Sequence, residues 1–312
     1  MRKVADATSI LRNGIRHNMK TLTDSQIHDF NENGYLLLED ALAPSDLNPL
    51  IAEFEEIVDT GAAELYAEGE IDSEFKTEGF DTRLAKITAQ SPALFQKVFS
   101  GAHTGPALFD LLVNPKLLDI AESLVGSEIM CHPAYRVRPK LPEHDRTLVP
   151  WHQDAGYMEP KCDSVLQLTI WIPLIDATVE NGCLEVIPHA HRDGVFRHRH
   201  SERFYLEIPD DALPKVEPVV VPVKFGSILL LTNLTPHRSI PNVSHQVRWS
   251  VDTRYQDAAK PTGYQPEAGF LARSRRHSED VVTTPEAFKR IRDEHQPGPG
   301  PNRWAKKETS DA

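Results

Sequence analysis

The sequence after Gly126 consists of short apolar runs separated by clusters of proline, glycine and asparagine. Runs of this kind, rich in valine, isoleucine, leucine and tryptophan, are typical of strands in an all-β sandwich or barrel. The runs that we expect to form strands are 129–137, 165–174, 183–187, 219–223, 227–232 and 246–255. This half of the chain is therefore predicted to be a β structure.

The sequence before Gly126 has helical periodicity instead. Thr23 is a capping residue ahead of a helical pattern that ends near Asn33-Gly34, and 35–38 is expected to be a strand. A second helix is expected to begin after 43–45, and a third helical region covers 106–125. Helices first and strands after predict an α+β fold rather than an alternating α/β fold.

Length and composition favour a single domain. The 312 residues, 40% of them hydrophobic, can bury one large core. We expect an N-terminal extension over 1–20, one domain over 21–270, and a helical or flexible C-terminal extension over 271–312. Within that extension, the proline- and glycine-rich stretch 297–301 and the charged end 306–312 predict a loose tail.

The chain is acidic, with a formal net charge of -12 and a pI near 5.6. An acidic surface argues against nucleic acid or an anionic membrane as a partner, so a small molecule is the expected one. No stretch is apolar enough for a signal-peptide core or a membrane span, and we expect a cytoplasmic monomer or homodimer. The three separated cysteines, Cys131, Cys162 and Cys183, are expected to be reduced thiols.

The segment Trp151-His152-Gln153-Asp154 places an imidazole and a carboxylate two residues apart. On a strand, both side chains point to the same face and can reach one metal ion. The best candidate for a third ligand is His237. Two histidines and one carboxylate, with other positions open, suit non-haem iron(II), although a lone His-x-Asp match is usually a chance occurrence.

The segment 246–251 strengthens the metal hypothesis. It alternates polar and apolar residues and sets Arg248 and Ser250 on one face. That face meets solvent in an ordinary sandwich, but in a barrel with a ligand cavity it can point inward. An inward Arg248 can then hold a carboxylate through two hydrogen bonds near the metal.

The predicted strand 165–174 also has two distinct faces. One carries leucines and isoleucines, and the other carries Gln167, Thr169 and Trp171. The second face can line the same cavity. The alternative is that Trp171 is a packing residue and that the two polar residues are solvated.

These motifs resemble the phytanoyl-CoA dioxygenase family of 2-oxoglutarate-dependent oxygenases. The resemblance covers most of residues 22–256. Its matching segments are Leu22-Thr23, Asn33-Gly34-Tyr35, 151–154, 171–174, 176–188, Phe225-Gly226, His237, Ser239, Pro241-Asn242 and Arg248. Two segments depart from the family pattern: Ser227 stands where aspartate is usual, and His189-Ala190-His191 replaces Gly-Ser-His. Neither departure touches the candidate ligands.

The resemblance implies a double-stranded β-helix, a cupin-like jelly roll flanked by N-terminal helices. It implies that His152, Asp154 and His237 are catalytic iron(II) ligands and that Arg248 binds the distal carboxylate of the cosubstrate 2-oxoglutarate. Ser239 and Trp171 are then further cosubstrate contacts, and we add Gln167 and Thr169 from the face described above.

The implied reaction uses dioxygen to hydroxylate an unactivated C–H bond of a small molecule, with release of succinate and CO2. Asp154 favours hydroxylation over halogenation, because the related halogenases have glycine or alanine at this position. Desaturation or cyclisation can use the same three ligands.

The residues that bind the substrate are harder to predict. The basic run 189–203, including Arg203, either faces an anionic substrate or is a solvated loop, and the second is favoured because charge runs are usually surface. Candidates for contacts with a substrate or cosubstrate carboxylate are Arg83, Arg136, Arg138 and Lys140, although a surface charge is the favoured reading for each, and Tyr157 is a further candidate for a substrate contact. We expect residues 60–105 and the loop after Pro188 to cover the mouth of the cavity.

Two other functions fit part of the pattern. A zinc-dependent hydrolase also uses histidines and a carboxylate with an open position, but it gives Arg248 no role. A non-catalytic jelly roll that binds a sugar or a protein partner requires the histidines and aspartate to be structural. The intact set of three ligands argues against that reading.

Overall fold

A computed structural model describes residues 21–100, 103–202, 205–264, 269–295 and 303–304. The predicted N-terminal extension, Arg203 and the predicted tail segments 297–301 and 306–312 lie outside these residues. The main sheet has seven strands in the order β1-β9-β4-β11-β2-β12, with β3 also paired to β11. Its strands are β1 (Tyr35–Leu38), β2 (Ile129–Cys131), β3 (Arg136–Lys140), β4 (Leu168–Pro173), β9 (Ile228–Thr232), β11 (Arg248–Asp257) and β12 (Phe270–Arg273).

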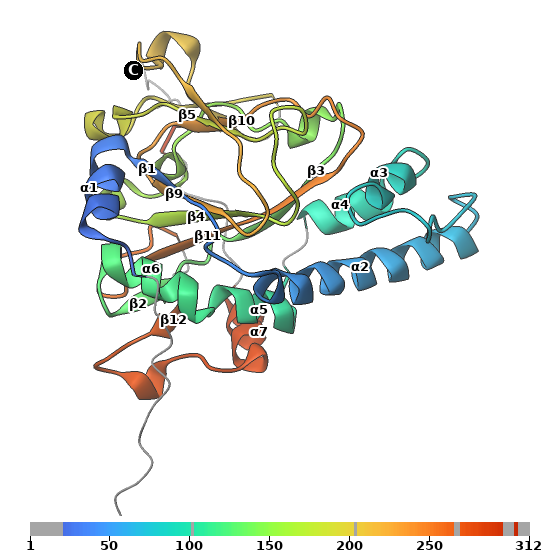
Figure 1. Ribbon diagram of the computed structural model, residues 1–312, viewed down its shortest axis with the longest axis horizontal. Coiled ribbons are helices and arrows are strands. Elements are labelled where there is room, and N and C mark those ends of the chain that lie inside the picture. Colours follow the sequence, from blue (N-terminus) through green and yellow to red (C-terminus); the bar gives the residue numbers. More distant parts are fainter. Residues whose placement is uncertain (1–20, 101–102, 203–204, 265–268, 296–302, 305–312) are drawn as a thin grey trace, which may run out of the picture.

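A smaller sheet faces the main one and completes the jelly roll (Figure 1). It is formed by β10 (His237–Ser239), β5 (Leu184–Val186) and β8 (Val219–Val221), in that order. Two isolated β-bridges extend this small sheet. One joins His152 to His237, and the other joins Ala177 to Val223. A short hairpin of β6 (Arg199–His200) and β7 (Leu206–Glu207) lies outside both sheets. The α+β fold and the double-stranded β-helix predicted from the sequence are confirmed.

The period-two pattern of the central strands explains how two apolar layers form. In β4, Leu168, Ile170 and Ile172 belong to the large core, which lies beneath the helices. Trp171 points the other way and packs with Leu229, Leu231 and Val186 between the two sheets. Successive side chains on a strand face opposite sides, so one strand contributes to both layers.

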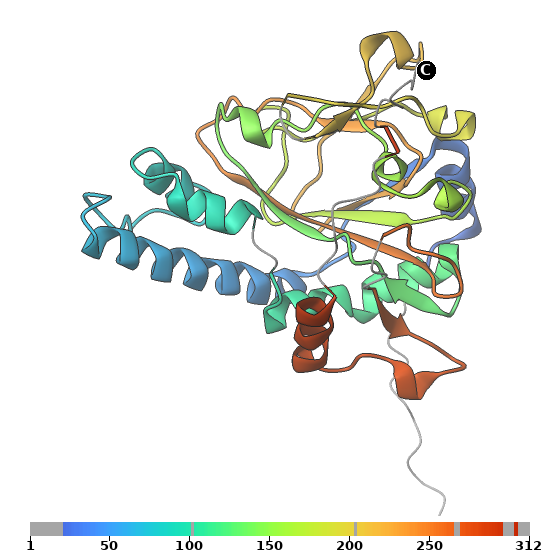
Figure 2. The same ribbon diagram turned by 180° about the vertical axis from the view of Figure 1, so that it is seen from behind.

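Helices cover the outer face of the main sheet and form an arm beside it (Figures 1 and 2). Thr23 and Gln26 form a capping box that begins α1 (Asp24–Asn33). The long α2 (Pro44–Ala67) projects from the sheets and carries α3 (Arg83–Thr88) and α4 (Ala93–Ser100) near its far end. The sheet is covered by α5 (Pro106–Leu112), α6 (Pro115–Val125) and α7 (Pro285–Glu294). Six short 3-10 turns complete the described chain: η1 (Asp145–Thr147), η2 (Asp154–Tyr157), η3 (Pro160–Cys162), η4 (Ala190–Asp193), η5 (Asp210–Ala212) and η6 (Ser278–Asp280).

Two predicted elements are each divided in the structure. The helical region 106–125 is two helices, because Pro115 begins a new helix capped by the side chain of Asn114. The predicted strand 129–137 is wrong as a single strand: β2 ends at Cys131 and β3 begins at Arg136. Pro133 lies in the interruption and has no N–H to donate to a ladder.

The described residues after 270 pack against the rest of the molecule. Phe288 of α7 is fully buried against Phe109 of α5 and Phe270 of β12. The core therefore continues into this segment, and the domain boundary at residue 270 stays a prediction.

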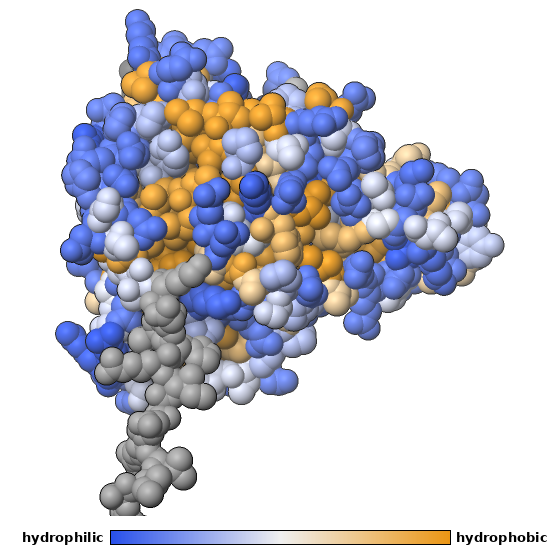
Figure 3. Space-filling view, in the orientation of Figure 1, coloured by the Kyte–Doolittle hydropathy of each residue, from blue (hydrophilic) through white to orange (hydrophobic). Residues whose placement is uncertain are grey.

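The surface of the face shown in Figure 3 is uneven in character. The projecting arm is mainly hydrophilic, whereas apolar side chains are visible across the middle of the face. Within the described part of the chain, no helix is long and apolar enough to cross a membrane.

Candidate metal centre

Three side chains predicted as ligands meet between the two sheets. One donor atom from each of His152, Asp154 and His237 lies within 4.8 Å of the others, and all three residues are buried. The backbones of the two histidines pair directly: the His152 N–H donates to His237 at 3.0 Å, and the His237 N–H donates to His152 at 2.9 Å. This bridge holds the two imidazoles with their ring centroids 4.2 Å apart.

Both imidazoles are oriented by backbone carbonyl groups. Nδ1 of His152 lies 2.9 Å from the Pro150 oxygen, and Nδ1 of His237 lies 3.0 Å from the Thr235 oxygen. Each Nδ1 therefore carries the proton, which leaves each Nε2 with a lone pair. Burial is the main cause that lowers the pKa of His152 to about 3. A neutral imidazole with a free Nε2 is the form that binds a metal.

Asp154 is held as a carboxylate by two residues of the main sheet. Arg254 donates to both carboxylate oxygens, from its NH2 group to Oδ1 at 2.7 Å and from Nε to Oδ2 at 2.9 Å. Thr169 donates to Oδ2 at 2.6 Å. Burial alone raises the pKa of Asp154, but the charge of Arg254 and the hydrogen bonds from it outweigh burial and hold that pKa well below its ordinary value. The carboxylate is therefore ionised and oriented.

The inward face of β11 forms a chain of alternating charges. Arg254 also donates to Asp252 at 2.8 Å, and Asp252 accepts from Nε of Arg138 at 2.7 Å. Asp154, Arg254, Asp252 and Arg138 thus form a continuous network that is buried except at Arg138, whose side chain is 28% exposed. Asp252 and Arg254 were not predicted as site residues, although they continue the alternation that begins at Arg248.

Arg248, also on β11, is only 3% exposed. It faces a small cavity beside the metal ligands. Its guanidinium donates to Ser250 at 2.9 Å and stands over the Trp171 ring, 5.1 Å from the centroid. Its Nε has no hydrogen-bond partner, and no carboxylate of the described chain lies within ion-pairing distance. Burial, and next the charge of Arg138, lower the pKa of Arg248 to about 9. A buried cation without a counter-charge suits an anionic ligand.

Lys140 lies directly opposite Arg248 in the pairing of β3 with β11. It is 2% exposed and donates to the Thr147 carbonyl at 2.9 Å and to Ser239 Oγ at 3.0 Å. Burial and the charge of Arg248 lower the pKa of Lys140 to about 7. Ser239 and Arg248 both line the small cavity, and Lys140 lies behind Ser239, to which it is hydrogen-bonded.

Other predicted site residues lie elsewhere or have a different role. Arg83 lies in the arm and is 8% exposed. It donates to the Glu74 carbonyl and forms an ion pair with Asp59. The cavity that it lines is separate from the metal ligands. Gln167 is fully buried and donates to Gln256 at 3.2 Å and to the Thr262 carbonyl at 3.0 Å. Thr169 lines the small cavity, but its hydroxyl group is bonded to Asp154.

The described part of the basic run 189–203 is mainly tied to neighbouring segments. Arg192 pairs with Glu32, Arg197 with Asp211, and Arg199 with Glu207. The three arginine side chains are 48%, 56% and 63% exposed. This arrangement supports the solvated-loop interpretation over a contact with an anionic substrate.

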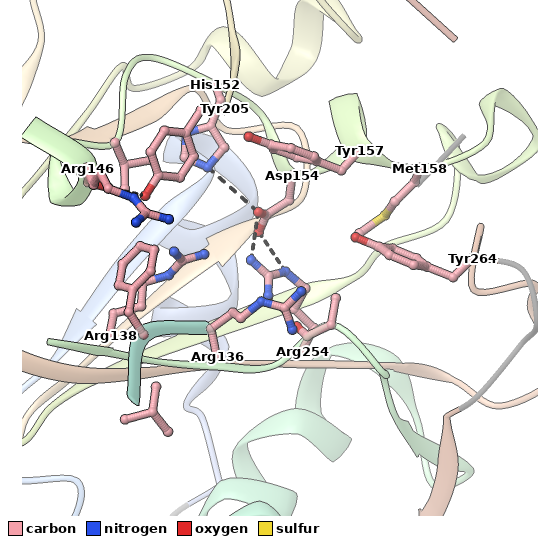
Figure 4. A pocket seen from close by; sticks show the side chains of 14 residues that line it. Arg136, Arg138, Arg146, His152, Asp154, Tyr157, Met158, Tyr205, Arg254 and Tyr264 are labelled. Carbon is pink, nitrogen blue, oxygen red and sulfur yellow. Dashed lines mark hydrogen bonds and ion pairs between the residues drawn. The ribbon is translucent and has the colours of Figure 1, made fainter. Parts of the chain in front are cut away.

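A larger cavity of about 270 Å³ opens on the metal ligands (Figure 4). His152 and Asp154 line it, and so does Tyr157, whose contact with a substrate stays a prediction. Its other lining residues are Phe99, Ala134, Arg136, Val137, Arg138, Arg146, Val149, Met158, Tyr205, Arg254 and Tyr264. Phe99 comes from the predicted covering segment 60–105. The roles of Arg146, Tyr205 and Tyr264 were not predicted, because no local pattern links these positions in the sequence.

Comparison with known proteins gives a consistent family assignment. Residues 30–250 match the family model described as phytanoyl-CoA dioxygenase (PhyH). A zebrafish protein, Phytanoyl-CoA dioxygenase domain-containing protein 1 from Danio rerio, is 25% identical over 80% of this chain and 94% of its own length. The 1-deoxypentalenic acid 11-beta-hydroxylase of Streptomyces arenae is 28% identical over 59% of this chain and 68% of its own length. The methylphosphonate hydroxylase of Gimesia maris is 28% identical over 77% of this chain and 83% of its own length.

Solved structures share the fold. The non-heme monooxygenase ThoJ superposes with a TM-score of 0.60 and 18% identity, covering 86% of this chain and 93% of that protein. The epimerase SnoN, solved with Fe3+, alpha ketoglutarate and nogalamycin RO, superposes with a TM-score of 0.52 and 19% identity, covering 77% and 86%. The family model spans well over half of the sequence and includes all three clustered ligands. The chain therefore belongs to the phytanoyl-CoA dioxygenase family of iron- and 2-oxoglutarate-dependent oxygenases.

Proposed function

We propose that this protein is an iron(II)- and 2-oxoglutarate-dependent dioxygenase that hydroxylates an unactivated C–H bond of a small molecule. One observation carries the proposal: Arg248 is a buried cation without a carboxylate partner in the described chain, and its cavity also contains His152 and His237. A dicarboxylate that reaches the metal with one end places its other carboxylate where that charge is needed.

His152, Asp154 and His237 would hold the iron. Two imidazole Nε2 atoms and one carboxylate oxygen form the donor set that suits non-haem iron(II) with open positions. Iron with 2-oxoglutarate and dioxygen supplies the oxidation: one oxygen atom enters the substrate as a hydroxyl group, and the other enters succinate as CO2 leaves. The protein groups orient the reactants and exclude water from them.

The groups around Arg248 would bind the distal carboxylate of 2-oxoglutarate. Arg248 and Lys140 supply positive charge, and Ser239 supplies a hydroxyl group between Lys140 and the cavity. Trp171 forms a wall against which the guanidinium of Arg248 is stacked. Asp154 is a carboxylate in the ligand set, which favours hydroxylation over halogenation.

A small-molecule substrate fits the size of the larger cavity, about 270 Å³. Two relatives are named for the oxidation of small acidic compounds, 1-deoxypentalenic acid and methylphosphonate. We extend only the small-molecule class to this chain at this point.

Family membership favours the oxygenase over both alternatives raised by the sequence. A zinc-dependent hydrolase gives Arg248 and Lys140 no function, and burying two cations together is costly. A non-catalytic jelly roll leaves unexplained why both Nε2 atoms and a carboxylate converge.

The test is an anaerobic titration of the purified protein with iron(II) and 2-oxoglutarate, followed by exposure to oxygen and assay of succinate. We expect a weak visible charge-transfer band and slow succinate formation. Asp154→Ala should lose both signals, and Arg248→Ala should weaken 2-oxoglutarate binding by about tenfold or more. Arg197→Ala, which removes an exposed arginine paired with Asp211, should behave as the wild type.

Two outcomes would contradict the proposed function. Tight retention of zinc, with neither band nor succinate in the folded wild type, would favour the hydrolase or the binding protein. Equal 2-oxoglutarate binding by Arg248→Ala and wild type would remove the observation on which the proposal rests.

A further inference from the structure

The larger cavity has a charge distribution that the metal and the cosubstrate do not explain. Four arginines line it, whereas Asp154 is the only carboxylate among the described residues that line it. Asp154 is neutralised by Arg254, and Arg138 is paired with Asp252 through the buried network. Arg136 and Arg146 are the other two arginines of this wall.

Arg136 lies beside Arg138 on the same face of β3, because the two residues are two positions apart on one strand. The guanidinium of Arg136 donates to its neighbour's carbonyl, Tyr135, at 2.9 Å. No carboxylate of the described chain lies within ion-pairing distance of it. Arg136 is an exposed residue that lines the cavity, and partial desolvation there, and next the charge of Arg138, lower its pKa. Two like charges thus share one wall of a partly enclosed space.

Figure 4 shows the arginines Arg138 and Arg146 on a different side of the cavity from its other labelled lining residues Tyr157, Met158 and Tyr264. Arg136 lies below Asp154. Arg136, Arg146 and the tyrosines do not line the small cavity of Arg248, whereas Arg138 lines both. The two cavities therefore share Arg138, Val149, His152 and Arg254, while Arg136 lines only the larger cavity and Arg248 only the smaller one.

We propose that the substrate of this enzyme is a small organic anion whose carboxylate or phosphoryl-type group pairs with Arg136, next to Arg138, and thereby places its C–H bond at the metal ligands. This proposal rests on the proposed function and extends it to the substrate class. Arginines present several N–H donors in a plane, which matches the oxygens of a carboxylate, a phosphonate or a phosphate. A partly enclosed positive wall also concentrates anions at the cavity.

The remaining walls limit the rest of the substrate. Phe99, Val137, Val149 and Met158 are apolar, and the volume of about 270 Å³ is at the small end for ligand sites. The expected substrate therefore has one anionic end and a short apolar body. Saturating 2-oxoglutarate must be present in any test, because 2-oxoglutarate is itself an anion that can enter the same space.

The experiment measures ligand position and affinity together. The protein is loaded with Mn(II) and saturating 2-oxoglutarate, and the paramagnetic relaxation of ligand protons is followed by NMR for hexanoate, hexylphosphonate and hexan-1-ol. We expect metal-dependent relaxation for at least one anion and at least about tenfold weaker binding of the alcohol. Preference for hexanoate or for hexylphosphonate identifies which anionic group the site accepts.

Variants of Arg136 test the residue assignment. Arg136→Gln should weaken anion binding by about tenfold or more, Arg136→Lys should retain part of it, and Arg197→Gln should retain all of it. Arg138 is not suitable for this purpose, because it also supports the network that holds Asp154. Equal binding of the alcohol and the anions, or anion binding unchanged in Arg136→Gln, would overturn the proposal.

A failure of this inference is distinguishable from a failure of the proposed function. The charge-transfer band and uncoupled succinate formation need no substrate, and the control variant Arg197→Gln should retain both. If the wild type gives the band and succinate but shows no anion preference, only the substrate class is wrong. If it gives neither signal, the proposed function fails irrespective of Arg136.

Discussion

Arg254 and Asp154 form a bidentate ion pair, with N–O distances of 2.7 and 2.9 Å, in which both partners are almost fully buried. Asp154 is also the only carboxylate in the predicted ligand set, so the arginine acts on the metal centre through it. The pair connects the ligand loop to the main sheet, because Asp154 lies in η2 and Arg254 lies in β11. A carboxylate held at both oxygens has its direction fixed before a metal binds.

Replacing Arg254 by methionine should weaken metal binding and stability together. Groups that orient a metal ligand typically contribute about 10- to 100-fold to metal affinity. The change also leaves Asp154 and Asp252 buried with less positive charge, which should lower the free energy of unfolding by about 3–5 kcal/mol. Iron(II) affinity and urea denaturation measure the two effects.

Arg254→Lys provides the matched variant, because it retains the charge without the paired geometry. It should fold and recover part of the metal affinity. Unchanged iron(II) affinity in a folded Arg254→Met protein would show that Asp154 is oriented without the arginine.

Thr169→Val should weaken metal binding without a comparable effect on stability. The variant removes the 2.6 Å hydrogen bond from Thr169 to Oδ2 of Asp154, and a bond to a charged group contributes about 1.5–3 kcal/mol. We expect about tenfold weaker iron(II) binding by calorimetry. Thr253→Val, at an equally buried threonine of the next strand, is the control and should retain wild-type affinity. A parallel loss in both variants would indicate general damage to the sheet.

Much of the fold follows from local patterns in the sequence. The capping box at Thr23 places the start of α1, and the expected strand 35–38 coincides with β1. The period-two alternation from Arg248 predicted an inward polar face, and Arg248 and Ser250 are indeed bonded to each other inside the molecule. These features depend on neighbouring residues, so a single sequence contains the information.

The missed features depend on distant residues. Arg254 is paired with Asp154 100 residues earlier, and no local pattern relates the two positions. The strand β10 contains only three residues and is defined by its pairing with β5. Arg83 was predicted as a substrate contact from its residue type alone. In the fold it lies in the arm, where it pairs with Asp59.

Binding of 2-oxoglutarate should depend on pH through Lys140. Burial and the charge of Arg248 of β11 lower the pKa of Lys140 to about 7. The other groups that contact the Lys140 ammonium, Ser239 of β10 and Thr147 of η1, are neutral. Below pH 7 the lysine is charged and attracts a carboxylate, and above pH 7 it is neutral. The affinity for 2-oxoglutarate should therefore fall as pH rises, by at most about tenfold per pH unit.

The lowered pKa of Lys140 should also make the stability of the protein depend on pH. The unfolded chain keeps Lys140 protonated up to about pH 10.4, so between pH 7 and that value the unfolded state binds more protons. The contribution of Lys140 to the free energy of unfolding should rise with pH in this window, and Lys140→Met should remove the rise. Titrations of the charge-transfer band at several pH values, with iron affinity measured separately, test the binding effect. A pH dependence that is unchanged in Lys140→Met would assign it to another group.

Gly34→Ala should destabilise the connection between α1 and β1. Gly34 has a φ of 82° and caps α1 through its N–H, while its carbonyl accepts from Thr232 and from the Thr235 hydroxyl group. An added Cβ would lie 2.5 Å from His191 Nδ1 and 2.7 Å from Thr235 Oγ1. The positive φ alone costs about 1 kcal/mol, and the contacts should bring the total loss to about 2–3 kcal/mol. Gly69→Ala is the matched control, because Gly69 has a φ of 76° with nothing within 4 Å of the added atom, and it should lose only the backbone share. Urea unfolding with unchanged m-values measures both, and equal losses would mean that the His191 and Thr235 side chains move away at no cost.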